Sequence, residues 1–339
     1  MIDIFNEIKQ WVESNKRFAL ATVVKTWGSA PRPLGSAMAI SENGEILGSV
    51  SGGCVEGDVS KKALDILESG QSQLVHYGVS DEQAWTVGLS CGGKIDVFIE
   101  PFFAFNEKDE IWKELDQSIE HNQAGTLLFD LSGAKSNHLF IKANQIAVGR
   151  IALDSEIKIA KRTIEERKHL FDADAKLFAQ LIPRKSQLII IGAAHITVDL
   201  VDFGNQFGFE TIVIDPRGFF TANTQFKSEP DQCINDWPAE VLPKFPLDQF
   251  TYVVTLSHDP KIDDQALQIL MSSDVAYIGA LGSKRTHAKR VARLSEHGFS
   301  DTQIANIHGP VGLSINAKTP KEIALSVIGQ ILQVKNQFL

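Results

Sequence analysis

Cysteine is scarce in this sequence. Only three of its 339 residues are cysteines, Cys54, Cys91 and Cys233, and no two of them form a C-x-x-C motif. An odd number of widely spaced cysteines argues against a disulfide framework and is typical of reduced thiols in a cytoplasmic protein. We therefore expect a cytoplasmic location.

The sequence also lacks long apolar runs. None approaches the roughly 20 residues that a membrane-spanning helix needs. The first 18 residues, MIDIFNEIKQWVESNKRF, have no apolar core of the signal-peptide kind. Their spacing instead predicts an amphipathic helix with Asp3 as its cap and with Ile4, Ile8, Trp11 and Val12 facing inward.

The sequence has fewer basic than acidic residues. The chain has 33 Lys and Arg against 42 Asp and Glu, which gives a formal net charge of −9. Nucleic acids and anionic membranes attract proteins through basic patches, so we expect neither as a main partner. The length is sufficient for two domains, and a content of 43% apolar and 22% charged residues is typical of globular proteins.

The most informative stretch lies just past the middle of the chain. Residues 188–191 form an unbroken apolar run that ends at Gly192, as in strands buried on both faces. From there to Phe207 apolar residues recur at helical spacing, and a second apolar run at 211–214 ends at Asp215. This order predicts a strand, a tight turn, a helix and a parallel strand, which together form a βαβ unit.

The turn of this unit keeps only part of the dinucleotide fingerprint G-x-G-x-x-G. Gly192 is present, but Ala194 and Thr197 replace the other two glycines. Ala194 puts a methyl group where a pyrophosphate would approach, and Asp215 lies 23 positions after Gly192, about where a ribose-binding acid is expected. We therefore expect a Rossmann-like fold and disfavour classical NAD(P) binding, with a nucleotide-free sheet core as the alternative.

Strands and helices continue to alternate toward the C-terminus, which predicts a parallel, doubly wound sheet. Apolar runs at 252–256, 275–279 and 304–307 alternate with helical stretches, and a capping box at residues 319–322 opens the last helix. The ligand crevice of such a sheet lies at the carboxyl ends of its strands. The polar residues that follow the strands there are His195, Asp215, Arg217, His258, Asp259, Ser283, Lys284, Arg285 and His308.

Gly282 and the three residues after it form one candidate at this edge. Glycine permits close approach, a helix start offers free N–H groups, and Lys284 and Arg285 supply cations, so the pattern is typical of an anion cradle that includes Ser283. A solvated helix face is the alternative for Lys284 and Arg285, and a hydrogen-bonded loop residue is the alternative for each histidine.

The N-terminal half predicts a second α/β domain, with a mixed sheet and a β-rich middle segment. Strands are expected at 18–25, 36–41, 45–50 and 94–100, with an Asn43-Gly44 hairpin turn and a helix from Val55 to Gly70. Three more strands are expected between 125 and 151, a helical stretch over 153–181 and a linker at 183–186. We therefore place the domains at 1–183 and 184–339.

Two cysteines lie in glycine-rich turns of this half. Cys54 follows Gly52 and Gly53 at the start of the predicted helix, where the helix dipole favours a thiolate. Cys91 precedes Gly92, which leaves its sulfur sterically open. If both turns meet over one pocket, the sulfurs would suit a soft metal or a sulfur-bearing ligand. The alternative is a pair of buried, unreactive turn residues.

Several motifs resemble those of the XdhC/CoxI family, in the same order and in both halves. They are GSAPRPLGSAM, GSVSGGCVEGDV, GLSCGG, IIIGAAHI, IGALGSKR and IHGPVGLSINAKTPKEIALSVIGQI. Members of this family are accessory proteins of xanthine, aldehyde and carbon monoxide dehydrogenase-type molybdoenzymes. The resemblance implies a commonly dimeric chaperone without turnover of its own. It would bind molybdenum cofactor, cooperate with a cysteine desulfurase in sulfurating it, and deliver it to the apo-enzyme.

The resemblance gives roles to the candidate residues. Cys54 and Cys91 would contact the molybdenum or dithiolene end of the cofactor. The carboxyl-end cluster would hold a phosphate or nucleotide-like part. The implied cofactor-binding set is Arg32, Gly52, Gly53, Cys54, Cys91, Gly92, Gly192, His195, Asp215, His258, Gly282, Ser283, Lys284 and Arg285.

Two other function classes stay open. One is an NAD(P)-dependent oxidoreductase that uses Asp215 for the ribose and His195 or His258 as acid or base. The other is a redox or metal module built on Cys54 and Cys91.

Overall fold

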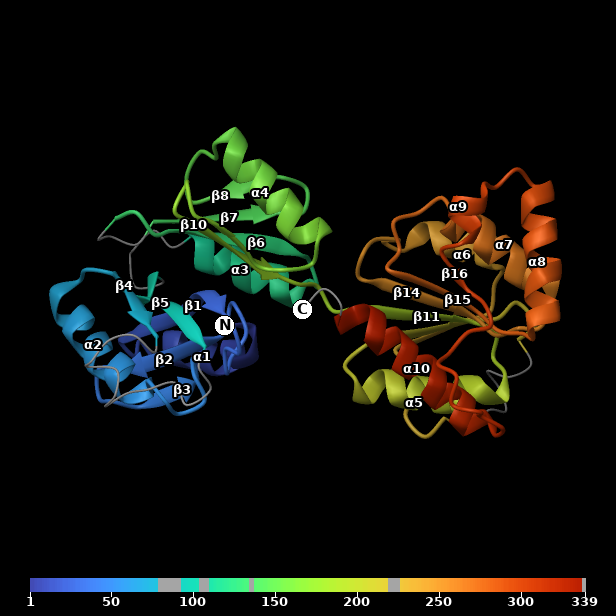
Figure 1. The fold of residues 1–339 in the computed structure, drawn as a ribbon, viewed down its shortest axis with the longest axis horizontal. Coiled ribbons are helices and arrows are strands. Elements are labelled where there is room, and N and C mark those ends of the chain that lie inside the picture. Colours follow the sequence, from blue (N-terminus) through green and yellow to red (C-terminus); the bar gives the residue numbers. More distant parts are fainter. Residues whose placement is uncertain (79–92, 104–109, 134–136, 219–225, 337–339) are drawn as a thin grey trace. The chain divides into compact units, whose positions relative to one another are not determined.

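The computed structural model describes residues 1–78, 93–103, 110–133, 137–218 and 226–336. The chain divides into two compact units, Met1–Pro183 and Arg184–Leu339 (Figure 1). No helix in the described ranges combines the length and apolarity that crossing a bilayer requires.

The first sheet of the N-terminal unit has the strand order β3-β2-β1-β5-β4. All four neighbouring pairs are antiparallel, so the expected mixed sheet is wrong. The reason is connectivity, because β1, β2 and β3 follow one another through short connections and the predicted hairpin turn at Gly44 is present. The strands are β1 (Phe18–Trp27), β2 (Ala37–Ser41), β3 (Ile46–Gly48), β4 (Gln73–Tyr77) and β5 (Lys94–Pro101).

Helices cover both faces of this sheet. Alternate residues of β1 point to opposite faces, so Ala19 and Ala21 pack with helix α2 (Glu56–Ser69) while Phe18 and Leu20 pack with helix α1 (Phe5–Glu13). The buried face of α2 agrees with the prediction, and the helix ends at Gly70 in the left-handed conformation.

Asp3 does not cap α1, which corrects the prediction. It lies within a preceding 3-10 turn, η1 (Ile2–Ile4), and no side-chain cap bond forms at the start of α1. Its carboxylate instead lies 3.0 Å from Nη2 of Arg32 and 3.3 Å from the amino group of Met1.

The second sheet of this unit has the order β8-β7-β6-β10-β9 and is also antiparallel. Helices α3 (Glu110–Glu120) and α4 (Asp154–Glu165) pack against it. Its strands are β6 (Gly125–Asp130), β7 (His138–Lys142), β8 (Ala147–Val148), β9 (Leu170–Asp172) and β10 (Leu177–Ile182).

The predicted helical stretch over 153–181 is wrong in its second half. Only α4 is helical there, and the rest forms the β9–β10 hairpin. Asp172 accepts hydrogen bonds from the N–H groups of Asp174 and Ala175, and Lys176 has a φ of 51°, so the chain turns back at this point. Every residue of β10 is then buried between its two neighbouring strands.

The C-terminal unit contains a six-stranded parallel sheet with the order β13-β12-β11-β14-β15-β16. This is the classical 3-2-1-4-5-6 arrangement of dinucleotide-binding folds, so the predicted Rossmann-like class is confirmed. The strands are β11 (Gln187–Ile191), β12 (Glu210–Ile214), β13 (Gln232–Ile234), β14 (Thr251–Thr255), β15 (Tyr277–Ala280) and β16 (Ile307–His308).

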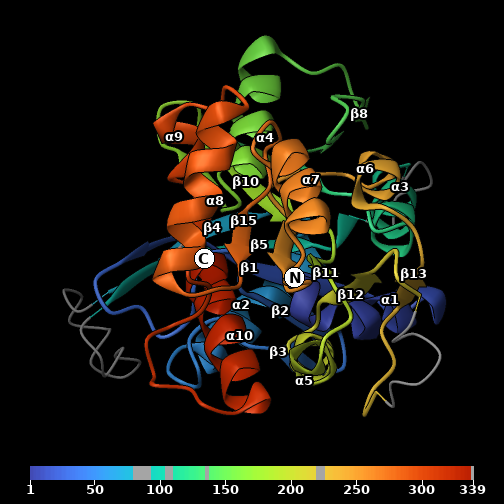
Figure 2. The same cartoon turned by 90° about the vertical axis from the view of Figure 1, so that its right-hand side faces the viewer.

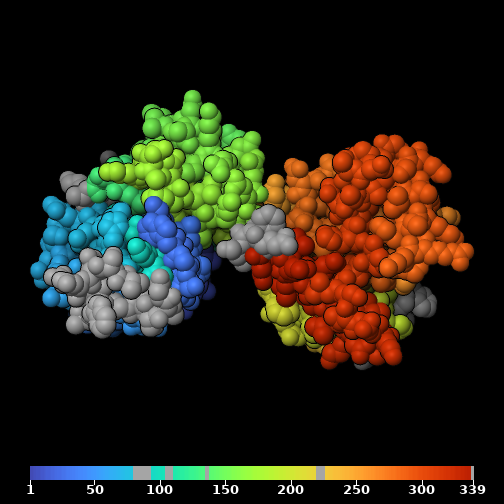
Figure 3. Space-filling view, in the orientation of Figure 1, coloured from blue at the N-terminus to red at the C-terminus, as the bar shows by residue number. Residues whose placement is uncertain are grey.

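Helices cover this sheet on both faces, as Figure 2 shows. Leu188 and Ile190 of β11 face α5 (His195–Gln206) and α10 (Pro320–Asn336), whereas Ile189 and Ile191 face the opposite layer. Figure 3 shows the red segment that includes α10 as a band on the surface of this unit. The opposite layer consists of α6 (Pro238–Val241), η4 (Leu242–Lys244), α7 (Pro260–Leu270), α8 (Lys284–Glu296) and α9 (Asp301–Ile304).

Two details of the helix predictions have different outcomes. The capping box of α10 is confirmed, because Glu322 accepts a hydrogen bond from the N–H of Thr319 and donates its own N–H to the Thr319 hydroxyl.

Phe207, expected on the inner face of α5, is 47% exposed. It lies one residue past the end of the helix, where the helical spacing no longer applies.

Candidate functional site

The fingerprint turn, residues 192–197, connects β11 to α5 at the carboxyl edge of the parallel sheet. Gly192 has a φ of 105°, and a Cβ atom there would lie 2.5 Å from the backbone nitrogen of Ser257. Only glycine fits this position, since the turn touches the segment after β14 directly. The strand order places the crevice of such a fold between β11 and β14, so this contact lies at that crevice.

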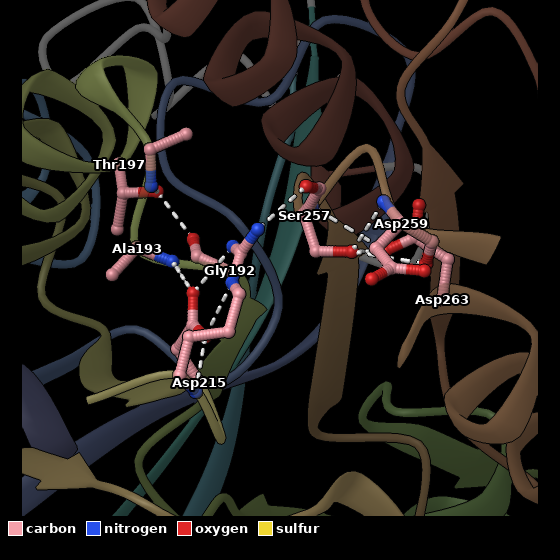
Figure 4. A network of polar contacts seen from close by, with 9 residues as sticks. Gly192, Ala193, Thr197, Asp215, Ser257, Asp259 and Asp263 are labelled. Carbon is pink, nitrogen blue, oxygen red and sulfur yellow. Dashed lines mark hydrogen bonds and ion pairs between the residues drawn. The ribbon is translucent and has the colours of Figure 1, made fainter. Parts of the chain in front are cut away.

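The N–H groups of Ala193 and Ala194 in the fingerprint turn are bound within the protein (Figure 4). The N–H of Ala193 donates to the carboxylate of Asp215 at 2.8 Å. The N–H of Ala194 donates to the hydroxyl of Thr197 at 3.1 Å, and that hydroxyl donates to the carbonyl of Gly192 at 2.7 Å. N–H groups of this turn hold a pyrophosphate in classical fingerprints, and here the side chains of Asp215 and Thr197 occupy those of Ala193 and Ala194.

Asp215 is placed where the ribose-binding acid was expected, but its oxygens are engaged. Besides the Ala193 bond, Oδ1 accepts from the N–H and Nε of Arg217, and Oδ2 accepts from Nη2 of Arg217 at 2.7 Å. Burial by itself raises the pKa of Asp215, but the hydrogen bonds from Arg217 and Ala193 hold it below its usual range. The carboxylate therefore stays ionised as an internal partner of the turn.

The polar network extends from Asp215 along the edge of the sheet. Arg217 donates to the carbonyl of Ser257 at 3.3 Å, and the Ser257 hydroxyl donates to Asp263 at 2.5 Å. Asp259 caps α7 through the N–H of Lys261. Figure 4 shows this chain of contacts, which joins the ends of β11, β12 and β14. Arg217 thus bridges the crevice beside the fingerprint turn.

A cavity of about 250 Å³ lies next to this network, between the starts of α7 and α8. We call it the α7–α8 pocket. Its walls come from the segments after β14 and β15, so it lies at the carboxyl edge of the sheet. The lining residues are His258, Pro260, Asp263, Leu281, Arg285, Thr286, Lys289, Arg290 and Arg293.

Of the predicted anion cradle, residues 282–285, only one residue lines this pocket. Arg285 lines it, whereas Lys284 is exposed and is absent from the lining. Ser283 caps α8 by accepting from the N–H of Thr286 at 3.1 Å, and Gly282 has a φ of 144° next to that threonine. The role of Gly282 and Ser283 is therefore to start the helix that carries the pocket's cations.

The three histidines predicted at the carboxyl edge of the parallel sheet lie in different surroundings. His258 lines the pocket and is exposed, with a φ of 60°. His195 is the exposed first residue of α5. His308 stacks on Tyr277 with ring centroids 4.6 Å apart, and burial lowers its pKa. Of the three, only His258 lines the pocket.

Three cations of the pocket, Lys289, Arg290 and Arg293, were not among the residues predicted from the sequence. A signal for two of them was present, because Arg285, Lys289 and Arg293 recur every four residues and therefore share one face of a helix. Arg290 had no such signal. Its burial depends on how α8 packs against α7 and the end of β15.

In the N-terminal unit the glycine loop, residues 49–56, connects the first sheet to α2. Its carboxylate, from Glu56, accepts from the N–H groups of Ser51 and Gly53 at 2.8 Å and of Val55 at 3.2 Å. It also accepts from the hydroxyls of Ser49 and Ser51. Burial by itself raises the pKa of Glu56, but these hydrogen bonds hold it at about 2. Here too an internal carboxylate occupies the loop's donors.

Gly52 and Gly53 form the outer edge of this loop. Both have positive φ, 73° and 115°, and a Cβ on either would meet nothing within 4 Å. The glycines are needed for the backbone conformation, and the space beside them is open. Cys54 follows them, half-buried on the hydrophobic cluster beneath α2, on which Ala30 of the loop between β1 and β2 also packs. The N–H groups of Gly53 and Val55, on either side of Cys54, both donate to the carboxylate of Glu56.

The other N-terminal candidates are placed differently. Arg32 pairs with Asp3, as described above, and its Nε is buried without a hydrogen-bond partner among the described residues. Cys91 and Gly92 lie outside the described residues, so their meeting with Cys54 is not part of the described structure. In the described ranges no three His, Cys, Asp or Glu side chains lie close enough together to hold a metal ion.

Comparison with known proteins gives matches in both units. The profile described as the XdhC Rossmann domain matches residues 188–331, and the profile described as the XdhC and CoxI family matches residues 11–78. Among solved structures, the crystal structure of a protein described as a xanthine dehydrogenase from Bacillus halodurans superposes with a TM-score of 0.68. It is 28% identical in sequence and covers 98% of this chain and 95% of its own.

Two curated relatives extend the match over nearly the full length. A probable xanthine dehydrogenase subunit of Bacillus subtilis is 30% identical over 332 residues, which span 96% of both chains. The molybdenum cofactor insertion chaperone PaoD of Escherichia coli is 25% identical over 323 residues, which span 95% of this chain and 85% of PaoD. With family matches in both units and relatives that align over at least 95% of its length, this chain belongs to the XdhC and CoxI family.

Proposed function

We propose that this protein is a maturation chaperone that binds molybdenum cofactor, protects it and delivers it to a xanthine dehydrogenase-type molybdoenzyme. The proposal is supported by the similarity to the chaperone PaoD through both units. The structural observation that carries it is the closed fingerprint turn next to a cationic pocket. A nicotinamide enzyme needs the turn's donors for its cofactor, whereas a carrier of an anionic cargo needs the pocket.

The proposal assigns residues to two kinds of chemical group in such a cargo. Molybdenum bound by a dithiolene supplies a soft, sulfur-rich end, and the pterin carries a phosphate at the other. In the proposal Cys54 and Cys91 contact the soft end, and Gly52, Gly53, Gly92 and Arg32 line the space around it. The carboxyl edge of the parallel sheet, with Arg285 and His258, holds the phosphate or nucleotide-like part.

The partners follow from the same proposal. A cysteine desulfurase would supply the sulfur that is added to the molybdenum, and the apo form of the molybdoenzyme would receive the cargo. We propose a homodimer as the working assembly. The chain's own residues bind and shield the cofactor and have no step of turnover.

The experiment is co-purification of the protein from a molybdenum-replete host, with bound pterin measured by fluorescence after oxidation. We expect pterin in the wild type, and an occupancy reduced by at least half in Cys54→Ala and in Cys91→Ala. Cys233→Ala is the matched control, because Cys233 is exposed in the C-terminal unit and belongs to no candidate set. Equal occupancy in all four proteins would remove the cysteines from the site.

The same preparation separates the proposal from its two rivals. An oxidoreductase would bind NAD(H) or NADP(H) at micromolar concentration, and a metal module would contain stoichiometric metal without pterin. Pterin-free protein that shows either property would overturn the chaperone proposal. We expect no saturable binding of NAD(H) or NADP(H) at the fingerprint turn, since the N–H of Ala193 is held by Asp215.

A further inference from the structure

Arg290 is a buried cation with unused hydrogen-bond donors. Its side chain is 3% exposed, and Nη2 donates to the carbonyl of Leu281 at 2.8 Å. Neither Nε nor Nη1 finds a hydrogen-bond partner among the described residues. Buried donors of a charged group are costly to leave unsatisfied, so these two atoms indicate a partner that the protein itself does not supply.

Asp263 does not supply that partner. Its nearest carboxylate oxygen is 3.9 Å from Nη2 of Arg290, too far for a hydrogen bond. The other oxygen accepts a 2.5 Å bond from the Ser257 hydroxyl. Burial raises the pKa of Asp263, while the bond from Ser257 and the charge of Arg290 act against that increase. The acid therefore positions the segment after β14 and leaves Arg290 facing the pocket.

The other cations of the pocket share one face of α8. Arg285, Lys289 and Arg293 are spaced by four residues, a distance at which like charges on a helix repel. Arg293 is neutralised by Asp264, with Nε and Nη2 at 2.6 and 3.0 Å from its oxygens. Arg285 and Lys289 are exposed and have no ion-pair partner in the part of the chain that the structure describes. An anion bound between them would relieve this repulsion.

The pocket has the size and position for a small polyanion. A volume of about 250 Å³ accommodates a phosphate or a diphosphate and is below the usual range for whole drug-sized ligands. The first turn of α7 forms one wall, but Asp259 and Asp263 offset the positive end of that helix, so the positive charge of the pocket comes from α8. In the fingerprint turn, by contrast, Asp215 and Thr197 already accept the hydrogen bonds of the Ala193 and Ala194 N–H groups.

We propose that the α7–α8 pocket binds a phosphoryl group, with Arg290 as its buried anchor and with Arg285 and Lys289 as its solvent-side cations. The guanidinium of Arg290 donates through Nε and Nη1, the atoms without internal partners among the described residues. The assignment of this group to the phosphate of the cofactor cargo rests on the proposed function. The phosphate site itself does not, because free phosphate or another phosphate ester has the same chemistry.

The test is calorimetric titration of the full chain at constant ionic strength with inorganic phosphate, pyrophosphate and AMP, and with adenosine as the control that lacks phosphate. We expect saturable binding of at least one phosphate probe and none of adenosine. Binding of inorganic phosphate alone would assign the site to free phosphate, and stronger binding of AMP would assign it to an ester. Absence of binding by all three phosphate probes would overturn the proposal.

Matched variants locate the site on the molecule. Lys289→Ala should weaken phosphate binding about tenfold, because a hydrogen bond to a charged group is typically worth about that factor in affinity. Lys284→Ala removes the same charge from the same helix outside the pocket and should change affinity by less than about twofold, the size of a screened surface effect. Equal losses in Lys284→Ala and Lys289→Ala would show a general charge effect and refute the pocket.

Arg290→Gln tests the anchor directly and should abolish binding. If this buried substitution prevents folding, as seen by circular dichroism, Arg285→Ala takes its place with the same expected direction as Lys289→Ala. The outcome is separable from the chaperone proposal, because pterin occupancy is measured independently. Loss of phosphate binding with unchanged pterin occupancy in Lys289→Ala would show that the pocket holds phosphate but not the cargo.

Discussion

The carboxylate of Asp215 accepts a 2.8 Å hydrogen bond from the backbone N–H of Ala193, across the turn that joins β11 to α5. This contact converts an acid placed for a ribose into a structural partner of the turn. Arg217 completes the arrangement, because it neutralises the acid and reaches the carbonyl of Ser257 at the end of β14. The domain thus keeps the classical strand order while its classical binding turn is closed.

We predict that Asp215→Asn lowers the free energy of unfolding by about 2 kcal/mol, because Arg217 then faces an amide and loses its counter-charge. Asp199→Asn is the control, since Asp199 pairs with the exposed Lys227 at the surface. That change should cost less than about 1 kcal/mol. Urea unfolding measures both, and equal effects would show that the buried position of Asp215 adds nothing.

Gly192→Ala should be among the most destabilising single changes, at about 3 kcal/mol or more. The new Cβ would meet the backbone of Ser257 at 2.5 Å in addition to straining a positive φ. Gly208→Ala provides the comparison, because Gly208 also has a positive φ of 75° but nothing within 4 Å of its Cβ position. We expect a loss of only about 1 kcal/mol there. Thermal unfolding of both variants checks the difference.

Glu56→Gln should destabilise the glycine loop by about 2–3 kcal/mol near neutral pH, because an amide group would face donors that now bind a carboxylate. The folded pKa of about 2 lies below the ordinary value of 4.5, so the carboxylate's contribution is present above pH 4.5 and is lost as pH falls toward 2. The stability difference between wild type and variant should shrink over that window. Glu68→Gln, at an exposed position of the same helix, should have no measurable effect.

We predict a second loss of folding stability at acidic pH, caused by protonation of His169. Burial lowers its pKa to about 4, and the nearby Met1 ammonium adds to the shift, while its Nδ1 accepts from the N–H of Leu181. The unfolded chain binds a proton near pH 6.5 and the folded chain does not, so stability is full above pH 6.5. It should fall by roughly 3 kcal/mol as pH decreases from 6.5 to 4.

The variant His169→Asn tests this assignment, because its Oδ1 can accept the Leu181 hydrogen bond without titrating. We expect a flatter dependence of unfolding free energy on pH between 6.5 and 4. The exposed His121, changed to Asn, should leave the wild-type slope intact. An unchanged slope in His169→Asn would refute the role of this histidine.

The fold was predictable where a local sequence pattern is compatible with only one type of secondary structure. The apolar run 188–191, the glycine that follows it and the capping box at Thr319 each define an element through local chemistry, and all are present. The hairpin of β9 and β10 was missed because Leu177–Ile182, apolar except for Gln180, is buried on both faces, and such a run has no alternating pattern that distinguishes a strand from a helix.

The site was predictable only in part. Arg285 follows from its place after β15, and a four-residue repeat of cations marks Lys289 and Arg293. The burial of Arg290 and the capture of Asp215 by Ala193 depend on contacts between elements far apart in the sequence. No local pattern encodes such contacts, so they required the three-dimensional structure.

The carboxylate of Glu56 occupies the N–H groups of its own glycine loop, as a bound anion would. A carboxylate tethered three residues from Gly53 competes with any incoming phosphate at a high effective concentration, whatever the nucleotide content of the surroundings. An abundant metabolite would have to expel this carboxylate and leave its charge without the loop's donors. The loop is thereby shielded from common phosphate compounds, so a ligand that approaches Cys54 must be selected by something other than its negative charge.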